Sequence, residues 1–121
     1  MSEKTHSATV SMAGEPYIAK VGEVTIALSD RAMILEEVNG EKSYKPVIYF
    51  PQDDIEPEVL QPSNHQTHCP IKGDASYFSV KANGTLLENT AWFYPDPHRM
   101  VRAVKNYVAF YPDKVSVEKA G

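Results

Sequence analysis

The chain has 121 residues, of which 42% are hydrophobic and 23% are charged, a composition typical of a soluble globular protein. This length corresponds to one compact domain with a single core. The net charge of -4 excludes general binding to nucleic acid or to an anionic membrane surface, because such binding requires a basic face.

The cysteine count and the N-terminus indicate a compartment. One cysteine cannot form an internal disulfide, and no apolar block that could serve as a signal peptide or membrane span follows the polar start. We therefore expect a cytoplasmic protein. Residues 1–14 lack both strand and helix periodicity, which predicts a flexible polar leader followed by a single domain over residues 15–121.

Short strands with tight turns are predicted for the first part of this domain. Apolar and β-branched residues gather over residues 17–20, 23–28, 31–38 and 45–50, and glycine or proline separates these runs. Residues 51–66 are instead dense in proline, aspartate, asparagine and glutamine, a composition that predicts a long structured loop.

A β-hairpin is predicted next. Residues 75–82 alternate, so that Tyr77 and Phe78 point to opposite faces of a strand. Asn83-Gly84 then fits a type I′ turn, because both central residues of such a turn need positive φ. Residues 85–94 form the returning strand.

One short helix and two further strands complete the predicted fold. Asp96 and the proline after it predict a capped helix near residues 97–104. Strands are predicted over residues 107–111 and 114–117. No βαβ alternation or glycine-rich fingerprint indicates a Rossmann fold, so the pattern predicts a mainly β domain.

The stretch with the most chemically versatile residues contains the only cysteine. Cys69 could be a nucleophile whose thiolate is favoured by His65 or His68, or it could simply fill a buried apolar space. The same three residues could bind zinc, but neighbours in an extended chain point to opposite sides, and we predict no metal site. The stretch reads Thr67-His68-Cys69-Pro70-Ile71-Lys72-Gly73-Asp74-Ala75-Ser76-Tyr77.

The turn within this stretch could bind an anion. Lys72 offers a positive charge to a phosphate or carboxylate, and Gly73 allows close approach of the backbone. Asp74 could act as a base, although such a turn is also typical of an ordinary solvated loop. A P-loop is not indicated, since its glycine and lysine spacing and the helix after it are missing.

Aromatic side chains could form the walls of a pocket here. Tyr77, Trp92 and Tyr94 are expected to wall a site in which Lys72 holds an anionic group. His65 or His68 would move protons near neutral pH, with Cys69 as nucleophile or packing residue. No cofactor follows from these residue types.

The order and spacing of several motifs resemble the domain of unknown function 427 family over about residues 20 to 117. The resemblance implies a compact, tent-like or barrel-like, mainly β fold and a cytosolic protein. It also implies a nucleotidyltransferase-like activity, although the paired metal-binding aspartates of two-metal chemistry are not evident. The resemblance is carried by Tyr49-Phe50-Pro51-x-Asp53-Asp54-Ile55, Pro62-Ser63-x-His65-x-Thr67-His68-Cys69-Pro70-x-Lys72-Gly73-x-Ala75-Ser76-Tyr77, Ala91-Trp92-x-Tyr94-Pro95-Asp96-Pro97 and Tyr107-Val108-Ala109-Phe110-Tyr111.

Two classes of function remain open. The first is a ligand-binding or enzymatic domain with a small polar ligand that could carry a phosphate or a carboxylate, with nucleotidyl transfer as a special case. The second is a non-catalytic interaction module, in which the same residues stabilise the fold. In both cases we expect neither nucleic acid nor a membrane as a general partner, because of the negative net charge.

Overall fold

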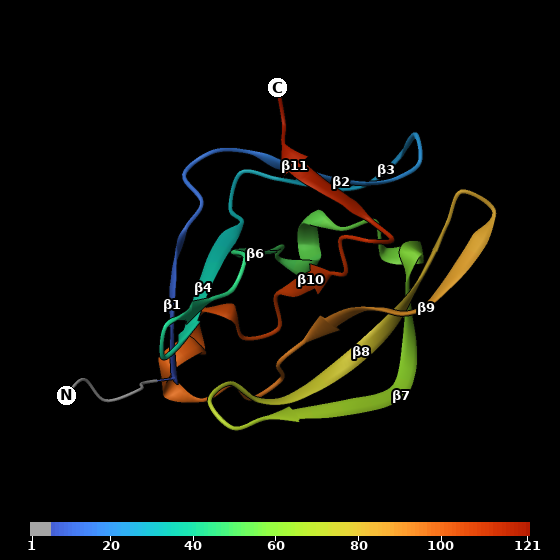
Figure 1. Cartoon of the computed structure of the whole chain (residues 1–121). Helices are drawn as coiled ribbons and strands as arrows, with labels where there is room; N and C mark the ends of the chain where they lie inside the picture. Colours follow the sequence, from blue (N-terminus) through green and yellow to red (C-terminus); the bar gives the residue numbers. More distant parts are fainter. Residues whose placement is uncertain (1–5) are drawn as a thin grey trace.

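The structure, a computed structural model, describes residues 6–121 and confirms a mainly β fold (Figure 1). Within this part of the chain, eleven strands form three antiparallel sheets, and all three helices are short 3-10 helices. The three sheets surround a central region into which β6 of the first sheet and β10 of the third sheet extend, and they do not close into one barrel (Figure 1).

The first sheet is built around its central strand β4 (Met33–Asn39). β4 pairs with β1 (His6–Met12), β5 (Lys42–Ser43) and β6 (Val47–Tyr49). The predicted flexible leader is therefore wrong for residues 6–12, which pair with β4 along their whole length. The pairing satisfies the backbone groups that face β4, and Ala8 is buried. Residues 1–5 of the predicted leader lie outside the described residues.

The second sheet has the order β11-β2-β3. It consists of β2 (Tyr17–Val21), β3 (Val24–Ser29) and β11 (Ser116–Lys119). Gly22 makes the predicted tight turn between β2 and β3 with a φ of 58°. The end of the described chain is thus anchored to one of its first strands.

The third sheet has the order β10-β9-β8-β7. Its strands are β7 (Leu60–Cys69), β8 (Gly73–Ala82), β9 (Thr85–Phe93) and β10 (Val108–Phe110). The hairpin predicted between β8 and β9 is confirmed, and both of its turn residues, Asn83 and Gly84, have positive φ.

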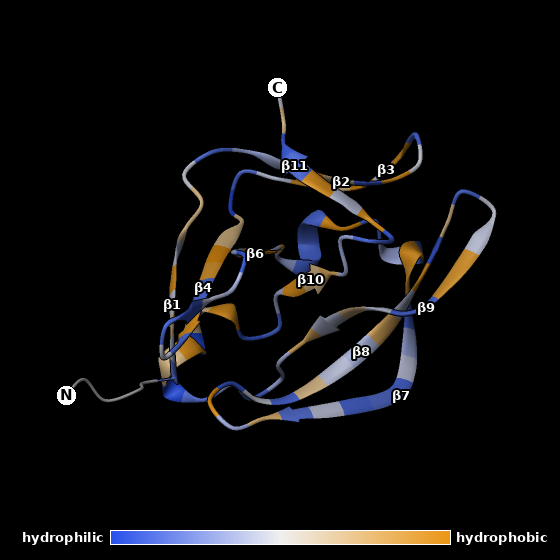
Figure 2. Ribbon diagram, in the orientation of Figure 1, coloured by the Kyte–Doolittle hydropathy of each residue, from blue (hydrophilic) through white to orange (hydrophobic). Residues whose placement is uncertain are grey.

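The predicted loop over residues 51–66 extends only to residue 59. It contains two short helices, η1 (Gln52–Asp54) and η2 (Pro57–Val59), and β7 begins at Leu60. β7 is an edge strand with mostly exposed, hydrophilic residues, as Figure 2 shows. It lacks the apolar alternation of a half-buried strand, and its composition therefore resembled that of a loop.

The predicted helix near residues 97–104 is present as η3 (Arg99–Val104), a 3-10 helix. His98 occupies its N-cap position, so the prediction that Asp96 caps this helix is wrong. Asp96 instead accepts a hydrogen bond from the Arg102 guanidinium at 3.0 Å. The backbone is kinked at Val101, whose φ of -123° is not helical. Val101 and Val104 are both fully buried, which fixes this segment against the core.

The buried residues form two clusters, and β8 contributes to both. Val80 and Ala82 belong to the first cluster, which also contains Phe50. Ala75 and Tyr77 belong to the second. Because alternate residues of a strand face opposite sides, the third sheet separates the two clusters, and the second one lies beside the predicted site.

Candidate functional site

The predicted site stretch forms the tip of the β7–β8 hairpin. Cys69 pairs with Gly73, so the stretch is the turn of a hairpin, whereas a loop leading into a strand was expected. Gly73 has a φ of 109°, and a Cβ there would lie 3.3 Å from the Asp96 carbonyl oxygen. The His98 N–H donates to the Lys72 carbonyl oxygen at 3.0 Å. The tip is thereby held against the segment that precedes η3.

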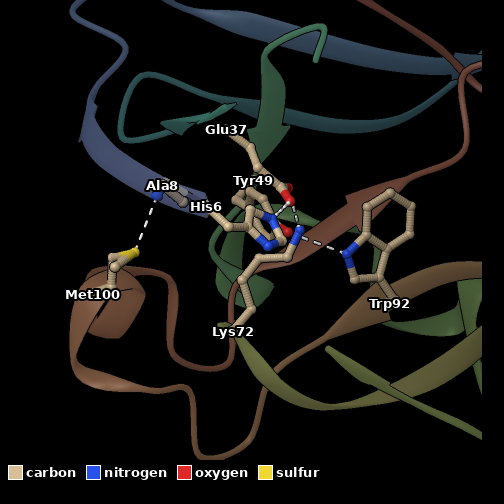
Figure 3. A network of polar contacts seen from close by, with 7 residues as sticks. All are labelled: His6, Ala8, Glu37, Tyr49, Lys72, Trp92 and Met100. Carbon is tan, nitrogen blue, oxygen red and sulfur yellow. Dashed lines mark hydrogen bonds and ion pairs between the residues drawn. The ribbon is translucent and has the colours of Figure 1, made fainter. Parts of the chain in front are cut away.

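Lys72 reaches from this tip into a partly buried ionic network (Figure 3). Its Nζ donates to Glu37 Oε1 at 2.6 Å, and Nε2 of His6 lies 2.7 Å from Glu37 Oε2. The side chains of Lys72 and Glu37 are only 16% and 14% exposed. We call these three residues the Glu37 network, which joins β1, β4 and the hairpin tip.

The partners of Glu37 control its ionisation. Burial raises the pKa of this carboxyl, but the hydrogen bonds from Lys72 and His6 and their charges outweigh burial and lower the pKa overall. Glu37 is therefore a carboxylate at neutral pH, and its charge is compensated at close range.

Two buried tyrosines lie close to this network. The Tyr49 hydroxyl accepts a hydrogen bond from Trp92 Nε1 at 3.1 Å. Burial raises the pKa of both Tyr49 and Tyr94, and the negative charges of Glu37 and of a Cys69 thiolate raise the two pKa values further. Both phenols therefore remain protonated at neutral pH and can act as hydrogen-bond donors.

An aromatic row connects this region to the surface. His65 and Tyr77 form an edge contact at 4.5 Å between ring centroids, and Trp92 lies 4.6 Å from Tyr111. The Tyr77 hydroxyl lies 3.0 Å from Thr67 Oγ1 and 3.4 Å from the Tyr111 hydroxyl. Burial and the contact with Tyr77 raise the pKa of Tyr111 to about 12. We call His65, Tyr77, Tyr111 and Trp92 the aromatic row.

His68 and Asp74 lie apart from the other predicted site residues. They form a cross-strand pair in which His68 Nδ1 is 2.7 Å from Asp74 Oδ1, and their side chains are 64% and 80% exposed. Their neighbours Thr67 and Ala75 belong to the face that carries Tyr77. The structure therefore gathers six predicted residues on one side of the hairpin and leaves these two on the other. The six are His65, Cys69, Lys72, Tyr77, Trp92 and Tyr94.

Three residues of this region were not predicted. His6 was assigned to the leader, and Glu37 and Tyr111 were assigned only to the predicted strands over residues 31–38 and 107–111. The one available signal was the pattern of two aromatics before a proline, shared by Phe110-Tyr111-Pro112 and Phe93-Tyr94-Pro95. His6 and Glu37 carry no local signal.

The family model described as domain of unknown function (DUF427) matches residues 10–121. The chain belongs to the DUF427 family. No protein of curated function matches it.

Four cavities of the DUF427 domain lie mostly away from the predicted site residues. The hollow between η2 and the β8–β9 turn has a volume of about 790 Å³, two others of about 320 and 310 Å³ border Asp54, and a fourth of about 230 Å³ borders Trp92. Trp92 is the one predicted site residue that lines any of these four.

Residues 6–121 offer neither a metal cluster nor a membrane span. Within that range no three His, Cys, Asp or Glu side chains are grouped so that they could hold a metal ion. No helix among the same residues has the length and hydrophobicity needed to cross a bilayer. Cys69 is a free, half-buried thiol.

Proposed function

We propose that this DUF427 domain binds a small polar ligand with a carboxylate or phosphate group on the inner side of the hairpin tip. The observation that carries the proposal is the partly buried ammonium group of Lys72 beside the aromatic row. The Lys72 ammonium group has three N–H donors, and one of them donates to Glu37. The other two could donate to an oxygen atom of a ligand.

The surrounding groups support a ligand site. Titratable side chains with shifted pKa values tend to gather at functional sites, and here Glu37, Tyr49 and Tyr94 all have shifted pKa values within one region. Two of them are the protonated phenols Tyr49 and Tyr94, which are buried. The aromatic row offers flat apolar surfaces for the rest of the molecule.

An enzymatic role would use the proton-bearing groups around Glu37. His65 or His68 was predicted to move protons beside Lys72, but the histidine in the Glu37 network is His6. Histidine is the side chain suited to proton transfer near neutral pH. Cys69 could act as the nucleophile or as a packing residue. A Cys69→Ser variant that keeps full activity would remove the nucleophilic role.

A ligand screen followed by thermal unfolding tests the proposal. Inorganic phosphate, pyrophosphate, nucleotides and small carboxylates are added to the full chain, and a ligand at about 100 times its Kd should stabilise the fold by about 2.7 kcal/mol. The rise in Tm should disappear in Lys72→Met and remain in Lys114→Met, a matched control at an exposed lysine. An equal rise in both variants would contradict the proposed site.

A structural role for the same residues is the second candidate. Its support is that the tip already bonds to its surroundings through both the side chain and the backbone of Lys72. In this case the domain would be an interaction module, and none of the screened compounds would raise the Tm of the wild type. A lower Tm of Lys72→Met is expected under both candidates, because the ion pair with Glu37 is partly buried, and it does not distinguish them.

Nucleotidyl transfer is a further, weaker proposal based on the resemblance. Two-metal phosphoryl transfer needs several carboxylates around the ions, and among residues 6–121 no such group of ligands occurs. Magnesium-dependent release of pyrophosphate from any of the nucleoside triphosphates would support it. A cytoplasmic location is also a proposal, which fits the free thiol and is testable by cell fractionation.

A further inference from the structure

We propose that the cavity beside Trp92 is a second binding site, which takes a small aromatic or aliphatic monocarboxylate. This site goes beyond the proposed function, because its lining excludes the Glu37 network. Eight residues line it: Lys45, Pro46, Val47, Ile48, Trp92, Phe110, Pro112 and Val117.

The cavity lies where the three sheets meet. Val47 and Ile48 come from β6 of the first sheet, Trp92 and Phe110 from β9 and β10 of the third, and Val117 from β11 of the second. These residues also belong to both hydrophobic clusters, since Phe110 is part of one and Trp92 packs against the other. The cavity is therefore a gap at the seam between two separately packed cores.

Burial along the lining gives the cavity a floor and a mouth. Phe110 is only 4% exposed, whereas Lys45, Pro46 and Pro112 are exposed. The walls are half-buried side chains, among them Trp92 and Val117. An empty apolar hollow forfeits dispersion contacts, so an apolar ligand body that enters from the Lys45 side would recover them.

The volume limits the size of the ligand. The cavity measures about 230 Å³. This is below the range of about 300–1,000 Å³ for sites of drug-sized ligands, and it equals the space of roughly seven or eight water molecules. One six-membered ring with a short side chain, or a short alkyl chain, fits this space.

The charge at the mouth selects the head group. Among the described residues that line the cavity, Lys45 alone is charged, and it takes part in none of the ion pairs formed within residues 6–121. One ammonium group balances one carboxylate. A phosphate dianion would need a second cation, so the geometry favours a monocarboxylate.

Trp92 gives this site a direct optical signal. It is the only tryptophan of the chain, and its indole ring borders the cavity while its Nε1 donates to Tyr49. Ligand in the cavity must therefore change the fluorescence of Trp92. Because Trp92 also belongs to the aromatic row, variants are needed to distinguish the two sites.

The experiment titrates Trp92 fluorescence of the full chain with 3-phenylpropanoate and with its uncharged analogue 3-phenylpropan-1-ol. We expect saturable binding of both compounds to the wild type. An exposed ion pair contributes at most a factor of about 5 to a binding constant. Lys45→Met should therefore weaken binding of the carboxylate by about that factor and leave the affinity for the alcohol unchanged. Lys42→Met, a matched control on the neighbouring exposed lysine, should bind both compounds like the wild type.

Two further measurements locate the ligand. Val117→Phe should abolish binding of both compounds by filling the cavity, and methyl NMR of the wild type should show ligand-induced shifts at Val47, Ile48 and Val117 even if that variant fails to fold. Lys72→Met should keep both affinities, which separates this site from the proposed function. Three results would overturn the inference. The first is a wild-type titration that does not saturate up to about 10 mM, which is a weak limit for so small a ligand. The others are unchanged binding of the carboxylate to Lys45→Met and loss of binding in Lys72→Met.

Discussion

The ion pair between Glu37 and Lys72 should show strong energetic coupling. Exposed ion pairs contribute about 0–1 kcal/mol, while removal of one partner from a fully buried pair costs about 3–5 kcal/mol. The two side chains are 14% and 16% exposed and lie 2.6 Å apart. We therefore expect Glu37→Leu and Lys72→Met each to lower the free energy of unfolding by about 2–3 kcal/mol, close to the buried limit.

The double variant should be less destabilised than the sum of the two single variants. Each single substitution leaves one charge in a partly buried position, whereas the double variant leaves neither. The difference, measured from urea unfolding at pH 7, should amount to about 1–2 kcal/mol. The exposed pair formed by Arg102 and Asp96, with exposures of 56% and 88%, provides a matched control.

The result that would refute this reasoning is additivity. If the Glu37 and Lys72 substitutions added within about 0.5 kcal/mol, as we expect for Arg102 and Asp96, the pair would behave as a surface contact. The partly buried ammonium group on which the proposed ligand site rests would then have no energetic basis.

Three other substitutions test separate parts of the region. Because the folded pKa of Glu37 is lowered from about 4.5, its carboxylate stabilises the fold above that pH and this contribution is lost as pH falls through the folded pKa. Glu37→Gln should therefore flatten the acid side of a Tm–pH profile, and an unchanged slope would contradict the shift. Gly73→Ala should cost about 1–3 kcal/mol in urea unfolding, because φ is 109° and the Asp96 carbonyl is 3.3 Å away. His68→Ala should change stability by less than about 0.5 kcal/mol, since its pair with Asp74 is exposed; a larger loss would reveal a contact beyond this pair.

The parts of the fold that sequence reasoning predicted depend on neighbours in the chain. Asn83-Gly84 needs positive φ at two adjacent residues, and this local requirement marked the β8–β9 hairpin. The short helix near residue 100 was likewise predicted, but its 3-10 geometry and its start were not. The start of this helix depends on a hairpin that is distant in the sequence, because the backbone N–H of His98 donates to the Lys72 carbonyl oxygen at the hairpin tip.

The missed elements depend on contacts between distant residues. β1 has few large apolar side chains, and only its pairing with β4 makes it a strand. β7 is an edge strand with both faces largely open to solvent, so its residues are polar and include Pro62. Period-based reasoning detects strands that bury one face, and neither of these strands has an extensive buried face.

The stretch that we propose as the site was singled out from sequence, but the residues that it contacts were not. The stretch around Lys72 stood out for its residue types, and strand alternation correctly predicted that His68 and Cys69 point to opposite sides. Glu37 lies 35 residues before Lys72, and His6 lies 31 residues before Glu37. No local pattern encodes these distances, because they arise only when β1 pairs with β4 beside the hairpin.

The pairing of Lys72 with Glu37 changes which anion the proposed site would prefer. An unpaired lysine would attract a phosphate dianion strongly, but here the carboxylate already neutralises the ammonium group. Glu37 and Lys72 together have no net charge. A monoanion would add a single charge to this neutral pair, whereas a dianion would leave two uncompensated charges in a partly buried place. Small monocarboxylates should therefore raise the Tm more than phosphate or pyrophosphate at the same concentration in the thermal assay, and a larger rise with the phosphates would contradict this argument.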